Sequence, residues 1–276
     1  EPMPADLDAA LNDPDVFIHA WNAEFERLIL KYVVKREIPI RRFKCSMARS
    51  RTMALPGKLE LAAKALKMPV QKADNSIMLK WCKPLPDGTW ASSMAEYEKL
   101  CAYCDMDVLT EIGVANMTRD LSPEEWEDYW VNCEINDRGL PLDMPLVRAA
   151  QNYAADETFE INQRVSMLTG GIVTTVKQHQ RIKEWIIPRL PPGMELKPRK
   201  GKISFDRNVR EYYLSVENED VIGGDLRDFI QLVHDGGRAS TAKFASMQAR
   251  TGPDGRLRGA YVFAGAGQTG RFSSTG

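Results

Sequence analysis

The chain has 276 residues, of which 43% are hydrophobic and 27% charged, and its formal net charge is −1. This length suits one large domain or two ordinary ones, and the apolar fraction is sufficient for a buried core, which excludes a wholly disordered chain. No apolar run approaches the ~20 residues needed to cross a bilayer, so we expect no membrane-spanning segment.

The small net charge conceals an uneven distribution along the chain. Residues 1–170 hold 20 Lys and Arg against 27 Asp and Glu, whereas residues 171–276 hold 17 against 11. A basic C-terminal half suits a polyanionic partner, and an acidic half would approach one through metal ions. Ordinary surface variation would give the same totals. The five cysteines, an odd number, favour a reduced intracellular protein over a disulfide framework.

The first 120 residues predict alternating strand and helix. Residues 16–20 are a short apolar run typical of a buried strand, and Asn22 is placed to cap the helix that follows. A second helix is predicted over 59–67, a turn over 84–88, and a longer helix after the capping box Ser93-x-x-Glu96. The expected inner face of that longer helix consists of Tyr97, Leu100, Cys104, Val108 and Ile112. This region is therefore α/β, with too few strands for a complete sheet.

Helices predominate after Thr118. A capping box with proline, Ser122-Pro-Glu-Glu125, opens a helix whose apolar face carries Trp126, Tyr129, Trp130 and Cys133. A long helix with Leu146, Ala150, Tyr153, Ile161, Val165 and Leu168 at helical spacing then runs to Gly170-Gly171. Further helices are predicted after the cap Thr175-x-x-Gln178, near 206–215, near 225–234 and over 240–250, followed by a strand over 257–263. We expect a domain boundary near residue 120, which separates an α/β region (1–120) from a mainly α region (121–276).

Two motifs carry residues suited to metal-dependent phosphodiester chemistry. Tyr103 and Asp107 are four residues apart, so a phenol and a carboxylate share one helix face. Asn22-Ala-Glu-Phe-Glu26 places an acid one turn into the helix that follows the first strand. Each motif also has a purely structural explanation. The first could be a tyrosine beside a solvated aspartate, and the second a glutamate that offsets the helix dipole.

A third motif, residues 267–274, combines glycines, hydroxyls and an arginine. Backbone amides around glycine, two hydroxyls and a guanidinium are suited to phosphate contacts on DNA, and a flexible tail is the alternative.

In this order, the segments resemble the phage-type branch of the family A DNA polymerases. Residues 22–26 are similar to the second motif of the family's 3′–5′ proofreading exonuclease, and Tyr103-x-x-x-Asp107 to the third. Thr269-Gly-Arg-Phe-Ser-Ser274 resembles the motif that opens the polymerase core. Residues 55–66, 78–84 and 134–143 also resemble the family's intervening text, so the match covers about residues 16–276.

The resemblance implies the following site. Asp107 and Glu26 would bind metal in a two-Mg²⁺ hydrolysis, with Tyr103 orienting the water. The resemblance also implies that DNA is contacted by Asn22, Arg238, Lys243, Thr269, Arg271, Ser273 and Ser274. Partners would be primer–template DNA and a single-stranded 3′ end in the cytoplasm of a bacterial or phage-infected cell, and dNTPs only in a full-length parent enzyme.

Two departures from the family accompany this resemblance. The first exonuclease motif, which supplies an Asp and a Glu, has no equivalent upstream of Val16, and Glu26 stands where the second motif usually has Asp. We therefore expect a fragment of a DNA-directed DNA polymerase: a partial, RNase H-like exonuclease region, a helical thumb-like region and the start of the palm, inactive as a polymerase by itself. The alternatives are a stand-alone metal-dependent 3′–5′ exonuclease and a non-catalytic DNA-binding protein on a degenerate exonuclease fold.

Overall fold

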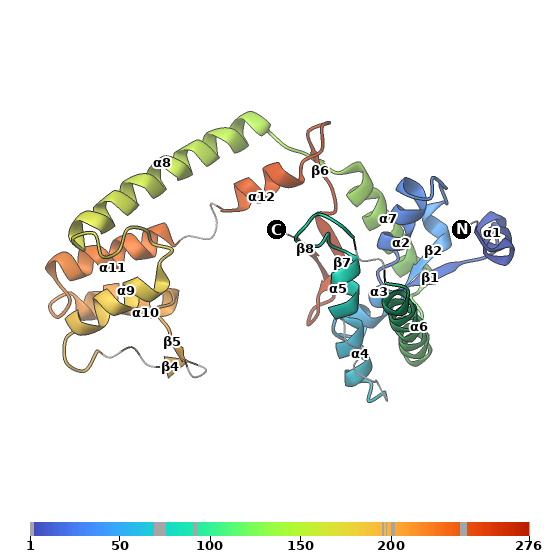
Figure 1. Cartoon of the computed structure of the whole chain (residues 1–276), viewed down its shortest axis with the longest axis horizontal. Coiled ribbons are helices and arrows are strands. Elements are labelled where there is room, and N and C mark those ends of the chain that lie inside the picture. Colours follow the sequence, from blue (N-terminus) through green and yellow to red (C-terminus); the bar gives the residue numbers. More distant parts are fainter. Residues whose placement is uncertain are drawn as a thin grey trace. The chain divides into compact units, whose positions relative to one another are not determined.

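The computed structural model describes residues 3–68, 76–90, 93–194, 196, 198–199, 202–237 and 242–275. The chain divides into two compact units, one formed by residues 1–140 with 258–275 and the other by residues 141–257. Both consist largely of helices, with a few short strands (Figure 1).

Among its described residues, the first unit contains eight helical elements and five strands. This count includes β3, which lies where the chain passes into the second unit. In chain order they are α1 (Ala5–Asn12), β1 (Ile18–Ala20), α2 (Glu24–Tyr32), the 3-10 turn η1 (Ile40–Arg42), β2 (Phe43–Cys45), α3 (Ser46–Thr52), α4 (Leu59–Ala65), α5 (Ser76–Trp81), α6 (Met94–Met117), α7 (Pro123–Arg138), β3 (Leu140–Pro141), β7 (Tyr261–Ala266) and β8 (Arg271–Ser274).

A parallel pair of strands, β1 and β2, supports the beginning of α2 and α3. Ile18 is opposite Phe43 and Ala20 is opposite Cys45, and the strand expected at 16–20 is confirmed over its last three residues. The prediction that Asn22 caps α2 is wrong. Asn22 instead forms the turn itself, with φ of 69°, and Ala23 occupies the N-cap position. Asparagine is one of the few residues that adopts this left-handed conformation at low cost.

Helix α7 is the central support of the first unit. Its capping box is confirmed, because the Ser122 hydroxyl accepts from the Glu125 amide and the Glu125 carboxylate accepts from the Ser122 amide. Its expected apolar face is confirmed for three side chains that are buried, Trp126, Tyr129 and Cys133. The fourth, Trp130, is partly buried and donates from Nε1 to the Phe43 carbonyl at 2.9 Å.

The C-terminal strands belong to this unit because α7 binds them. The Asn136 amide donates to the Tyr261 carbonyl at 2.8 Å and accepts from the Tyr261 amide at 3.0 Å. Arg258 Nε donates to the Asp137 carbonyl at 2.8 Å. Together with the bond from α7 to β2, these contacts put the boundary expected near residue 120 inside the unit rather than at its edge.

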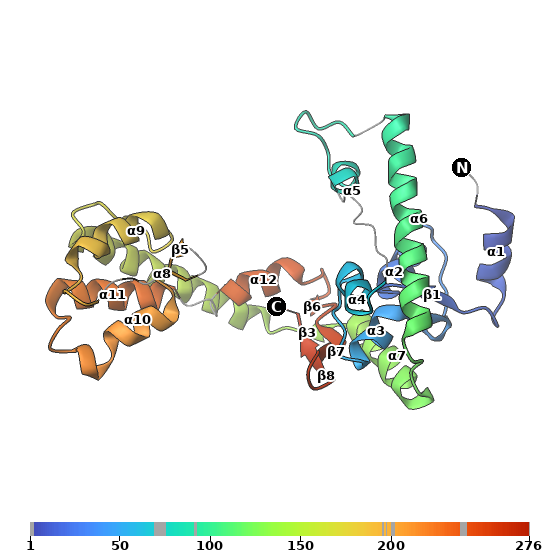
Figure 2. The same cartoon turned by 90° about the horizontal axis from the view of Figure 1, so that it is seen from below.

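Helix α6 packs against α3 and α4 through its C-terminal half (Figure 2). Val114 is fully buried against Ala62 and Ala63 of α4. The Arg49 guanidinium of α3 donates to the carbonyls of Ala115, Thr118 and Arg119, and so satisfies free acceptors at the end of the helix.

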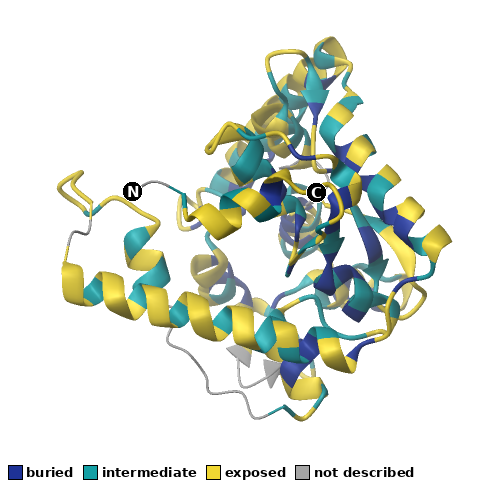
Figure 3. Ribbon diagram, turned by 90° about the vertical axis from the view of Figure 1, so that its right-hand side faces the viewer, coloured by how far each residue is buried: buried dark blue, intermediate teal, exposed yellow. Residues whose placement is uncertain are grey.

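The inner face expected for α6 is wrong. Tyr97, Cys104, Val108 and Ile112 are all exposed, and Figure 3 shows the helix carrying mainly exposed and intermediate residues. Helical spacing identifies an apolar stripe, but the neighbours decide its burial, and α3 and α4 contact a different side of the helix. Ser93 is the N-cap residue as expected, although its side chain makes no capping bond.

An antiparallel hairpin, β7–β8, contains the glycine-rich C-terminal motif. Val262 is opposite Ser273 and Ala266 is opposite Arg271, with an irregularity in between. A Cβ on Gly265 would lie 1.9 Å from Ser273 Oγ, so glycine is required for this close approach. The single strand expected over 257–263 is wrong: its residues are divided between β6 (Arg256–Leu257) and the beginning of β7.

The second unit contains five α-helices among its described residues. Its elements are α8 (Met144–Leu168), α9 (His179–Ile186), the 3-10 turn η2 (Ile187–Arg189), β4 (Pro198–Arg199), β5 (Lys202–Ile203), α10 (Arg207–Leu214), the 3-10 turn η3 (Val216–Asn218), α11 (Gly224–Gly236), α12 (Ala242–Arg250) and β6 (Arg256–Leu257). The expected succession of helices is confirmed in order and approximate position.

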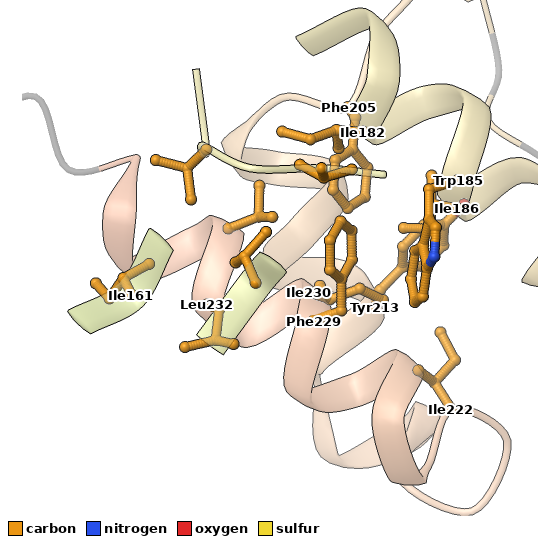
Figure 4. Packing of buried hydrophobic residues seen from close by; sticks show 14 of the residues in the cluster. Ile161, Ile182, Trp185, Ile186, Phe205, Tyr213, Ile222, Phe229, Ile230 and Leu232 are labelled. Carbon is orange, nitrogen blue, oxygen red and sulfur yellow. The ribbon is translucent and has the colours of Figure 1, made fainter. Parts of the chain in front are cut away.

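The core of this unit lies between the end of α8 and the helices α9, α10 and α11 (Figure 4). Trp185 and Phe229 are in ring contact at its centre, with centroids 4.2 Å apart. Burial of Ile161, Val165, Ile182 and Trp185 is confirmed, whereas Leu146 and Tyr153 are exposed because they lie in the N-terminal part of α8, away from the cluster.

The cap expected at Thr175 is displaced. Gln178 is the N-cap residue of α9, and its side-chain oxygen accepts from the amides of Thr174 and Thr175. Of the helices in the described ranges, none combines the length and apolar character that crossing a membrane requires.

Candidate metal and nucleic-acid site

Glu26 presents a carboxylate with unused binding capacity near the beginning of α2. The residue is partly buried, and its Oε2 atom has no hydrogen-bond partner among the residues that the structure describes. Burial raises the pKa of the Glu26 carboxyl, a bond to its own backbone amide offsets part of this rise, and the charge of Glu111 raises it further. An isolated, desolvated anion beside a second anion favours a cation as its partner.

Glu111, the acid whose charge acts on Glu26, is held in place by a buried serine. Ser46, the first residue of α3, has no solvent exposure and donates from Oγ to Glu111 Oε1 at 2.7 Å. The charge of Glu111 also acts on His19, the middle residue of β1. Burial and the charges of Lys44 and Arg49 lower the pKa of His19, and the charge of Glu111 acts in the opposite sense.

Tyr103 and Asp107 interact with each other on α6. Burial raises the pKa of the Tyr103 phenol, and the charge of Asp107 and a hydrogen bond to it raise the pKa further. The phenol and carboxylate thus form a pair, as their four-residue spacing predicts.

The Glu26 carboxyl is electrostatically coupled to Glu111 and not to Asp107. Within the described ranges, Glu111 is the acid whose charge acts on Glu26, and Asp107 does not contribute. Sequence reasoning missed Glu111 and Ser46. The repeat Tyr103, Asp107, Glu111 at four-residue intervals was a usable signal for the first. Ser46 reaches α6 only through tertiary packing, so no sequence signal was available.

The residues present fit one hydrated divalent ion better than a two-metal cluster. Mg²⁺ is usually bound by one or two carboxylates together with waters and substrate phosphate, and Glu26 and Glu111 supply that number, with one oxygen of Glu26 free. In the part of the chain that the structure describes, no three His, Cys, Asp or Glu side chains are grouped to hold a metal ion.

The residues expected to contact DNA lie in both units. Asn22 is exposed at the turn between β1 and α2. On the C-terminal hairpin, Thr269, Arg271 and Ser274 are exposed, while Ser273 is partly buried against Gly265. Lys243 is exposed on α12 of the second unit, and Arg238 lies outside the described residues.

Comparison with known proteins relates the chain to a phage DNA polymerase. No family model matches the chain. The chain is 29% identical, over 98% of its length, to a DNA polymerase of Bacillus phage SP02, of which the aligned region covers 42%. The chain is therefore similar to a phage DNA polymerase over nearly its whole length and spans less than half the length of that relative.

Proposed function

We propose that this chain is part of a DNA-directed DNA polymerase of family A, phage type, with a 3′–5′ exonuclease-like, RNase H-like first unit and a DNA-binding helical second unit. The observation that carries the proposal is the similarity to a phage DNA polymerase over 98% of the chain. The motif segments found in the sequence support the finer assignment through their order.

The proposed exonuclease chemistry uses the carboxylates of α2 and α6. Glu26 and Glu111 would hold a Mg²⁺ ion, with Asp107 as a further candidate ligand. When bound, the ion would lower the pKa of a bound water and neutralise charge on the scissile phosphate. Asp107 orders the Tyr103 phenol through their hydrogen bond, which prepares that phenol to orient a water. Ser46 holds Glu111 in place.

A comparison of conservative variants tests this assignment. We expect Glu26→Gln, Glu111→Gln and Asp107→Asn each to reduce Mg²⁺-dependent degradation of a single-stranded 3′ end by about 100-fold. Glu98→Gln, an exposed acid on the same helix as Asp107, is the matched control. Unchanged activity in all three variants would remove these carboxylates from the mechanism.

A non-catalytic DNA-binding role is the second candidate, favoured by a specific observation. The acid near Glu26 is not the one that the family's motifs supply, and the described residues contain no three-ligand metal group. Under this alternative, DNA binding occurs without degradation and is unaffected by removal of divalent ions.

Salt dependence tests DNA binding in either case. We expect Lys243→Ala and Arg271→Ala each to weaken binding and to reduce the slope of log K against log salt by about 0.7–0.9, because each removes one phosphate contact. Lys64→Ala, on the exposed surface of α4, should leave the slope unchanged. Equal slopes for all proteins would exclude Lys243 and Arg271 from the DNA contact.

A further inference from the structure

A cavity of about 300 Å³ lies inside the first unit, between the beginning of α2, helix α3, helix α7 and strand β7. Its walls share only Asn22 with the residues that the sequence associates with DNA. Both α7 and α3 pack directly against β7, so the walls belong to one packed body. The volume is at the lower end of the range for small-molecule sites, which suits a ligand of the size of a single nucleotide.

An unsatisfied amide lines this cavity. The Asn132 side chain of α7 is only 4% exposed, and its Oδ1 atom has no hydrogen-bond partner within the described structure. Buried polar atoms in folded proteins are almost always paired, and an unpaired one costs stability. An amide rotated by 180° presents either its oxygen or its nitrogen to the cavity, so Asn132 can both accept and donate.

The remaining walls supply a cation, a carboxyl group and aromatic rings. Arg51 of α3 lines the cavity and forms no ion pair or hydrogen bond with any described side chain. Glu24 at the beginning of α2 adds a partly buried carboxyl group to the wall. Tyr129, Tyr261 and Phe263 contribute aromatic surface, and the Tyr129 and Phe263 rings meet edge to face at 5.7 Å.

We propose that this cavity binds a single nucleotide whose base is adenine or cytosine, recognised through its exocyclic amino group. Asn132 and Glu24 are the residue types that pair with the amino-bearing edges of adenine and cytosine. The aromatic walls match the face of a base, and the Arg51 guanidinium matches a phosphate. The nucleotide can be free or the end of a strand. The site goes beyond the proposed exonuclease role, which uses Glu26 and the acids of α6.

Titration of the whole chain with mononucleotides tests the site. We expect dAMP and dCMP to bind more tightly than dTMP, which has no exocyclic amine. Asn132→Leu should weaken dAMP about tenfold while leaving the melting temperature unchanged or higher, because it removes an unpaired amide. Asn152→Leu, at an exposed asparagine of α8, is the matched control. Arg51→Met should reduce the affinity for dAMP to that for deoxyadenosine.

Two further comparisons complete the experiment. A short oligodeoxyadenylate that binds through Asn132 more tightly than dAMP identifies a strand end as the ligand, and the reverse identifies a free nucleotide. Asn132→Leu that lowers the melting temperature but retains dAMP affinity overturns the proposal, since the amide is then satisfied by a structural water. Equal binding of dAMP and dTMP, or equal binding by wild type and Arg51→Met, also overturns it. If the chain degrades DNA but shows no binding of dAMP, the nucleotide site is contradicted and the proposed function is not.

Discussion

A partly buried ion pair joins the helix that carries Glu26 to the central helix of the first unit. Arg27 of α2 is 4% exposed and donates from both terminal nitrogens to the two carboxylate oxygens of Asp137 on α7, each at 2.7 Å. A buried guanidinium is tolerated when a carboxylate meets it in this two-bond geometry. The orientation of Glu26 one residue earlier thus depends on this contact.

Removal of the carboxylate should destabilise the first unit. We expect Asp137→Asn to lower the free energy of unfolding by about 3 kcal/mol, because Arg27 remains buried without a counter-charge. The measurement is urea denaturation followed by tryptophan fluorescence. Glu37→Gln, which breaks the exposed Lys31–Glu37 pair at the end of the same helix, should cost less than about 1 kcal/mol. A similar loss for both variants would mean that the burial of Arg27 is energetically unimportant.

At the scale of elements, α7 organises the first unit from its N-terminus to its last turn. Its first turn is closed by the capping box, its apolar face enters the core, and its last turn holds β7 through Asn136. Glu125 has two roles there, as the cap of the Ser122 amide and as the partner of Arg119 in a bidentate ion pair with both bonds at 2.6 Å.

This arrangement predicts a pH-dependent helix start. The ion pair with Arg119 and the bond from the Ser122 amide lower the pKa of Glu125 from 4.5 to about 2. A carboxyl with a lower pKa in the folded state contributes stability above pH 4.5 and loses that contribution as the pH falls toward 2. We expect no more than about 1 kcal/mol from this largely solvent-exposed pair.

The variant Glu125→Gln isolates the charge, because glutamine can still form a capping box. The wild type should be more stable than the variant at pH 6, and the difference should vanish near pH 2. Thermal unfolding across this pH range provides the measurement. A constant difference would show that Glu125 acts through its shape and not its charge.

The molecule as a whole has separate cores. The cluster around Phe43, Trp126 and Phe263 belongs to the first unit, and the cluster around Trp185 and Phe229 to the second. Units with their own buried clusters respond individually to loss of core packing.

Truncation in the second core tests this division. We expect Phe229→Ala to destabilise the second unit by about 3–5 kcal/mol through cavity formation. Hydrogen exchange should then accelerate at amides of α9, α10 and α11 and remain unchanged in α7. Phe159→Ala on α8, where the side chain is 62% exposed, should cost about 0.5 kcal/mol or less. Acceleration throughout both units would show that they unfold together.

The sequence by itself determined most of the helices, their order and the pairing of Tyr103 with Asp107, because caps, prolines and four-residue spacing act over short distances. It did not indicate α1, α3 or α5. The sequence also indicated the similarity to a DNA polymerase, because the order of the motifs can be recognised in the sequence alone. Only the tertiary structure decided which acid acts electrostatically on Glu26. Glu111 is oriented by Ser46, and these residues are 65 positions apart.

The cavity has the same origin. Asn132 and Tyr261 line the same cavity because α7 binds strand β7, which lies far along the chain. The hydrogen-bonded residues Asn136 and Tyr261 are 125 positions apart. Likewise, the apolar stripe of α6 was visible in the sequence, but its exposure depends on which helices pack beside it. Contacts between distant segments are selected by the packing of the whole unit, and local patterns carry no information about that choice.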